Sequence, residues 1–60
     1  MDKAEKKELL KWADEGMICC QGIMDRKENS AEERALAQML FRNFYISKML
    51  LKEVKAYERF

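Results

Sequence analysis

The sequence predicts an all-α fold: a two-helix antiparallel hairpin that associates into a helical bundle, either a four-helix dimer or a larger oligomer. Three observations indicate this fold. The 60 residues contain no proline and two glycines, which is too few turn residues for a β architecture. Hydrophobic residues make up 48% of the chain and charged residues 38%, a balance that is typical of amphipathic helices. A single break, at residues 27–30, interrupts the helical pattern.

This break divides one domain, residues 1–60, into two predicted helices at about residues 3–27 and 31–59, joined by a turn at residues 28–30. Ser30 followed three residues later by Glu33 is a capping box, in which each side chain bonds the backbone amide of the other residue. The pattern therefore predicts that the second helix begins directly after Ser30.

The ends of the first helix carry weaker signals. Asp2 with Glu5 repeats the capping pattern at its start. Arg26 and Lys27 place positive charge at its predicted end, where the helix dipole is negative. Asn29 is expected to stop the helix in a left-handed conformation.

The first helix has an apolar seam with alternating spacings of four and three residues, which is typical of coiled coils. With its flanking residues, this face is wider than contact with one other helix requires. A chain of this size buries only about 60% of the surface that it exposes when unfolded. We therefore expect other copies to cover the remainder. The predicted oligomer core consists of Leu9, Ala13, Gly16, Cys20, Ile23, Leu36, Leu40, Phe44, Leu50, Val54 and Tyr57.

Gly16 lies among small seam residues, between Ala13 and Cys20, and has two interpretations. Another helix backbone can approach closely at this point, or a large side chain opposite, such as Phe44, can fill the gap. The sequence does not decide between them.

Asn43 and Ser47 lie one turn apart in the middle of the apolar stripe of the second helix. Unpartnered polar groups are costly to bury, so we expect them to bond each other or their symmetry copies. A polar seam residue of this kind fixes helix register and oligomer state. The alternative is a small polar ligand pocket, with Arg42 at its edge supplying an anion contact.

Phe41, Tyr45 and Met49 fall on the opposite, outer face of the second helix, with Lys48 and Lys52 beside them. Aromatic, Met and Arg side chains are enriched at protein interfaces, so the leading hypothesis is a regulatory or inhibitory module, of the kind common among phage and mobile-element regulators, that docks on another protein. An aromatic pair among cations can also bind RNA or a nucleotide. A purely structural assembly unit would cover these residues within the oligomer. The residues of the anionic-ligand alternative are Arg42, Asn43, Ser47, Lys55 and Arg59, with Lys48, Lys52 and Tyr45.

Enzymatic activity is not expected. The chain has no histidine, and Cys19 and Cys20 are its only cysteines, without a neighbouring activating base. These residues form no metal-ligand set, catalytic dyad or phosphate-binding loop, so we expect no metal and no cofactor. The start of the chain lacks the apolar segment of a signal peptide, and no apolar run approaches the ~20 residues of a membrane span. We therefore expect a cytoplasmic protein without a membrane partner.

The opening residues Met1, Lys3, Glu5, Lys6 and Leu9, the chain length and the single central break resemble the plasmid-encoded RNA-modulator hairpins. The resemblance implies dimerisation into a four-helix bundle. In that family, polar and aromatic residues of the first helix grip RNA. Here the first helix is charge-balanced on its outer face and the basic, aromatic face belongs to the second helix, so no functional residue is carried over.

Overall fold

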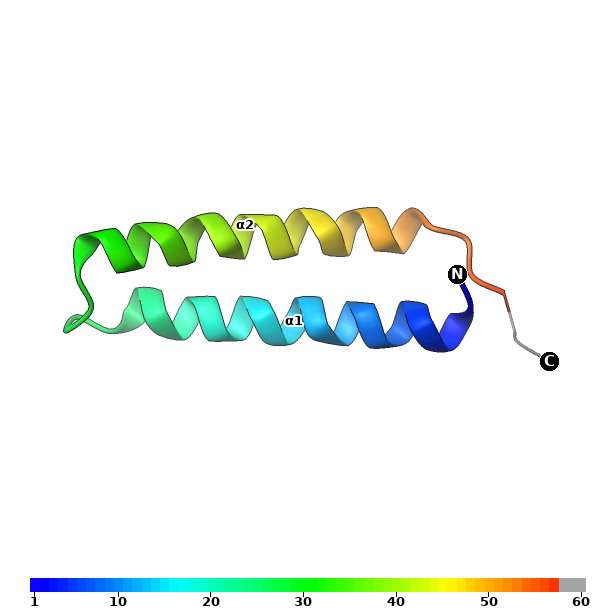
Figure 1. Ribbon diagram of the computed structural model, residues 1–60, viewed down its shortest axis with the longest axis horizontal. Coiled ribbons are helices and arrows are strands. Elements are labelled where there is room, and N and C mark those ends of the chain that lie inside the picture. The colour runs from blue at the N-terminus through cyan, green and yellow to red at the C-terminus, as the bar shows by residue number, and fades with distance from the viewer. Residues whose placement is uncertain (58–60) are drawn as a thin grey trace.

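The computed structural model is a helical hairpin, and it describes residues 1–57 (Figure 1). Helix α1 spans Lys3–Asp25 and helix α2 spans Ala31–Glu53. The two helices lie antiparallel, so the start of α1 lies beside the end of α2, at the end of the hairpin opposite the turn (Figure 1). The predicted all-helical hairpin is therefore confirmed.

Both predicted helix starts are confirmed, together with their capping boxes. The Glu5 amide donates to the Asp2 carboxylate at 2.8 Å, and the Asp2 amide donates to the Glu5 carboxylate at 3.4 Å. At the start of α2 the Glu33 amide donates to the Ser30 hydroxyl at 3.1 Å, and the Ser30 amide donates back to the Glu33 carboxylate at 3.4 Å. Each box satisfies backbone donors that the first helical turn leaves without an intrahelical partner.

The predicted end of the first helix is wrong by two residues. Helix α1 ends at Asp25, so Arg26 and Lys27 belong to the turn and not to the last helical turn. Asn29 does not adopt a left-handed conformation, since no non-glycine residue in the described part of the chain has a positive φ. Its carboxamide instead donates to the Ile23 carbonyl at 3.0 Å, which satisfies a carbonyl at the helix end.

The second helix also ends earlier than predicted, at Glu53 and not at residue 59. Val54 closes it in an extended conformation, and the chain then passes the start of α1. The Lys3 amide donates to the Tyr57 carbonyl at 2.8 Å, and the Tyr57 amide donates to the Met1 carbonyl at 3.3 Å. These two bonds form a short parallel bridge between Asp2 and Tyr57.

Lys6 connects the start of α1 to the end of α2. Its ammonium group donates to the Val54 carbonyl at 2.7 Å and to the Lys52 carbonyl at 3.3 Å. A cation at a helix C-terminus bonds otherwise unpartnered carbonyls and opposes the negative end of the helix dipole. The Lys6 contacts and the bridge between Asp2 and Tyr57 therefore stabilise the end of α2 at Glu53.

Small residues fill the contact between the two helices. Ala13 and Cys20 of α1 and Ala37 of α2 are the buried apolar residues of the described chain, with exposed fractions of 5%, 4% and 2%. A Cβ atom on Gly16 would lie only 2.5–2.6 Å from ring carbons of Phe44. The second interpretation of Gly16 is therefore confirmed: the missing side chain leaves room for an aromatic ring. No large side chain among residues 1–57 is fully buried.

Candidate interaction surfaces

The apolar stripe predicted for helix 2 does not form the hairpin seam. A neighbouring stripe of α2, which contains Ala37, Phe41 and Phe44, faces α1 instead. The predicted stripe stays open to solvent, with exposed fractions of 58% for Leu36 and 61% for Leu50. Six of its seven predicted residues, which we call the open stripe, are Leu36, Leu40, Asn43, Ser47, Leu50 and Val54, the last of which caps α2. The seventh, Tyr57, lies beyond the end of α2.

Asn43 and Ser47 lie in the middle of the open stripe and are themselves exposed. None of the hydrogen bonds found among residues 1–57 involves either side chain. Asn43 and Ser47, which we call the polar pair, would therefore contact a second helix that packed on the open stripe.

Helix α1 contributes apolar side chains to the same side of the hairpin. A groove of about 270 Å³ runs between the helices near the turn, and Ile23, Leu36 and Leu40 all line it. Trp12 lies three helical turns before Ile23 on the same side of α1, with 55% of its surface exposed. The open stripe and the two α1 residues together form what we call the open face.

The exposed apolar surface of α2 is large for a helix of its length. Six of its Leu, Ile and Met side chains have exposed fractions of 43–63%: Leu36, Met39, Leu40, Ile46, Met49 and Leu50. A lone hairpin therefore leaves most of the large apolar side chains of α2 in contact with water.

The five residues predicted to bind a partner do not share one surface. Phe41 is half-buried in line with Ala37 and Phe44, which face α1, so its placement on the outer face was wrong. Lys48 is also half-buried, and its ammonium group pairs with the Asp14 carboxylate of α1 at 2.5 Å. Nothing in the sequence indicates this pair, since its two residues are 34 positions apart.

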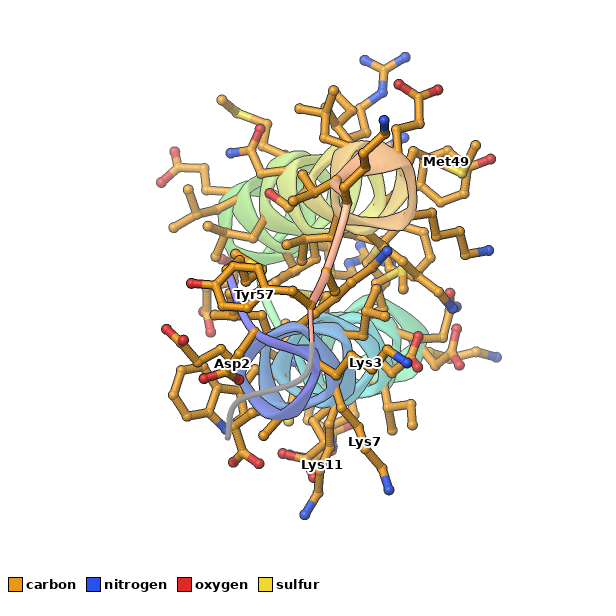
Figure 2. All side chains as sticks on the ribbon, turned by 90° about the vertical axis from the view of Figure 1, so that its right-hand side faces the viewer. Asp2, Lys3, Lys7, Lys11, Met49 and Tyr57 are labelled. Carbon is orange, nitrogen blue, oxygen red and sulfur yellow. The ribbon has the colours of Figure 1, made fainter. Side chains whose placement is uncertain are left out.

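Tyr45, Met49 and Lys52 remain exposed, and Arg42 lies on the same side of α2 at helical spacing. We call these four residues the outer patch. Met49 and Tyr57 point to opposite sides of the hairpin in Figure 2. By helical spacing, the outer patch lies about half a turn around α2 from the open stripe, so the two are separate surfaces.

The residues predicted for an anionic ligand are spread over several places. Arg42 belongs to the outer patch, whereas Asn43 and Ser47 belong to the open stripe. Lys55 is exposed but lies beyond the end of α2, in the extended segment. Arg59 lies outside the described residues.

The part of the chain that the structure describes contains no group of three His, Cys, Asp or Glu residues placed to hold a metal ion. Within the same residues, neither helix is both long and apolar enough to cross a membrane. Cys19 is exposed and Cys20 is buried, and both are free thiols. The geometry thus describes a helical hairpin with two separate surfaces.

No protein-family model matches the chain, and no curated protein or solved structure is significantly similar to it.

Proposed function

We propose that the chain is a non-enzymatic binding module that works as a homo-oligomer, most simply a dimer that forms a four-helix bundle. The open face is the surface through which the copies associate. The main support is that the hairpin buries only small apolar residues, whereas Leu36 and Leu50 are more than half exposed. Burying such side chains fully contributes about 1.5–3 kcal/mol each, so association recovers stability that the single hairpin lacks.

The outer patch is the surface that this proposal assigns to a different protein. Tyr45 and Met49 provide exposed apolar contact area, and Arg42 and Lys52 provide charged contacts at the edges. A bundle closed by the open face leaves this patch accessible, since the patch lies on another side of α2. The chain would act there as a regulatory or inhibitory module.

An anionic ligand such as RNA or a nucleotide is the weaker candidate for the outer patch. Lys48 is paired with Asp14, and Lys55 lies off the helix, so fewer cations surround Tyr45 than the sequence predicts. Nucleic-acid binding weakens steeply as salt rises, whereas docking through an apolar patch changes little. A salt titration of any partner complex separates the two candidates.

The test of self-association is the molar mass in solution, measured by light scattering for the parent and two variants. Leu50→Glu places a charge on the open face and is expected to reduce the oligomer to monomer or to unfold it. Tyr45→Glu places the same charge on the outer patch and is expected to leave the mass unchanged. A monomeric parent contradicts the proposed oligomer, and dissociation by Tyr45→Glu makes the outer patch a subunit interface.

A further inference from the structure

The open stripe has a symmetry that bears on how a second copy sits on it. Its residues are distributed evenly about position 45, in both spacing and chemistry. Asn43 and Ser47 lie two residues to either side of that position, and Leu40 and Leu50 lie five residues to either side. Leu36 and Val54 complete the stripe at nine residues to either side.

We propose that two copies of this chain associate through α2, with the two α2 helices antiparallel and a two-fold axis at the level of residue 45. This inference rests on the proposed self-association and adds the identity and direction of the contacting helices. In this arrangement Leu40 of one copy meets Leu50 of the other copy, and Leu36 lies beside Val54, the residue that caps α2. Apolar residues therefore meet apolar residues along the whole stripe.

The same arrangement gives the polar pair its partners. Asn43 of one copy meets Ser47 of the other copy, and the two-fold axis repeats this contact. The carboxamide can donate to the hydroxyl oxygen, and the hydroxyl can donate to the carboxamide oxygen. Both side chains thus keep hydrogen bonds when the interface excludes water. Without such partners, burying these polar groups would destabilise the interface.

A parallel arrangement would also place each residue next to its own copy, so the apolar pattern alone does not choose the direction. Charge makes that choice. Glu32 lies one helical turn before Leu36, on the side of α2 that carries the open stripe. Parallel helices would bring Glu32 beside its own copy and would align the two helix dipoles. Antiparallel helices keep the two Glu32 carboxylates apart and oppose the two dipoles.

The chemistry of the stripe agrees with a second copy as the occupant. Leu36 and Leu50, which are 58% and 61% exposed, lie on either side of the polar pair. A self-complementary stripe is what a two-fold interface requires, because the same patch serves both copies.

Cysteine cross-linking tests the direction of the helices. The background is the full chain with Cys19→Ser and Cys20→Ala, and light scattering must first establish that it keeps the parent's mass. Leu40→Cys and Leu50→Cys are then prepared separately in this background, one of them labelled with ¹⁵N. Each variant is oxidised alone and as an equal mixture, and the disulfide-linked dimers are identified by intact mass.

The antiparallel arrangement predicts a mixed light–heavy disulfide in the mixture and little disulfide in either variant alone. Two Leu40→Cys chains would hold their new thiols about 15 Å apart along the helix axis, which is beyond disulfide reach. Efficient cross-linking of either variant alone indicates parallel helices and overturns the inference. A dimer that cross-links in none of the three samples does not pair its open stripes, which also overturns it.

If Leu40→Cys or Leu50→Cys lowers the molar mass of the protein in solution, the test is repeated with Leu36→Cys and Val54→Cys. Agreement with the mixed-only pattern supports the inference at the ends of the stripe, and cross-linking of single variants contradicts it. A parent protein that is monomeric contradicts the proposed self-association itself. The mass measurement thus separates failure of the proposed function from failure of the proposed direction.

Discussion

The ring of Phe44 occupies the space that a Cβ atom on Gly16 would require. The atoms would be 2.5–2.6 Å apart, well inside van der Waals contact. Gly22, in the same helix, has nothing within 4 Å of the corresponding position. The two glycines of α1 therefore provide a matched pair for testing how the hairpin packs.

We expect Gly16→Ala to destabilise the hairpin and Gly22→Ala to stabilise it. Alanine gains about 1 kcal/mol over glycine in a helix at either position. At Gly16 the extra methyl group overpacks the seam, which costs about 1–3 kcal/mol and outweighs the gain. Chemical denaturation of both variants measures the difference. Equal stabilisation by the two substitutions would show that Phe44 does not pack on Gly16 in solution, and a Gly16→Ala/Phe44→Leu double variant should recover part of the loss.

The helix starts and the α1 side of the helix contact were predictable from the sequence, whereas the side of α2 that packs against α1 was not. The helix starts were predictable because each capping box is a local pattern of four residues. The seam residues Ala13 and Cys20 of α1 were predictable because that helix has one dominant apolar face. Helix α2 has two apolar stripes, and periodicity cannot tell which of them faces α1. The structure places Phe41 and Phe44 there, where the small residues of α1 accommodate aromatic rings.

The early end of α2 was unpredictable for a different reason. Residues 54–59 contain neither glycine nor proline, so no local signal stops the helix after Glu53. The contacts that accompany the stop come from residues about 50 positions away, at the start of the chain. Long-range contacts of this kind leave no pattern in the local sequence.

Lys6 is expected to hold the segment after α2 against the start of α1. Lys6→Gln removes the charge that bonds the Val54 and Lys52 carbonyls. We predict faster hydrogen exchange at the Tyr57 amide, with a loss of global stability below about 1 kcal/mol because the site is exposed. Lys7→Gln is the control, since Lys7 points away from α2 in Figure 2. Similar exchange at Tyr57 in both variants would contradict this role of Lys6.

Asp2 should make the start of α1 sensitive to acid. The amide of Glu5, which donates to the Asp2 carboxylate, lowers the pKa of Asp2 below its ordinary value of 3.8. A lowered folded-state pKa means that the charged carboxylate stabilises the cap above about pH 4, and that this contribution is lost as pH falls through the lowered pKa.

We predict that protection of the Glu5 amide from exchange falls with acidification over that range. In Asp2→Asn the uncharged carboxamide still caps the helix, so the protection should be lower at neutral pH and should not depend on Asp2 titration. The account of this cap is wrong if Asp2→Asn shows the same acid-dependent loss as the parent.

Asn43 and Ser47 are expected to lower the stability of the oligomer and to restrict its paired α2 helices to one direction. Replacing Asn43 and Ser47 together by leucine makes the open stripe continuously apolar. We expect a higher melting temperature at a given protein concentration, together with a mixture of parallel and antiparallel cross-links. Gln38→Leu, on an exposed position outside the stripe, is the control and should change neither property. An unchanged melting temperature and an unchanged cross-link pattern would show that the pair is not at the interface.

The most direct test of the account is the dependence of thermal unfolding on protein concentration. A hairpin whose open face is covered by a second copy unfolds with dissociation, so its melting temperature rises with protein concentration. We predict such a rise for the parent chain over a hundred-fold dilution series followed by circular dichroism, with Tyr45→Glu behaving alike. A cooperative transition at the same temperature throughout the series would show that the single hairpin is stable alone, and would contradict the central claim.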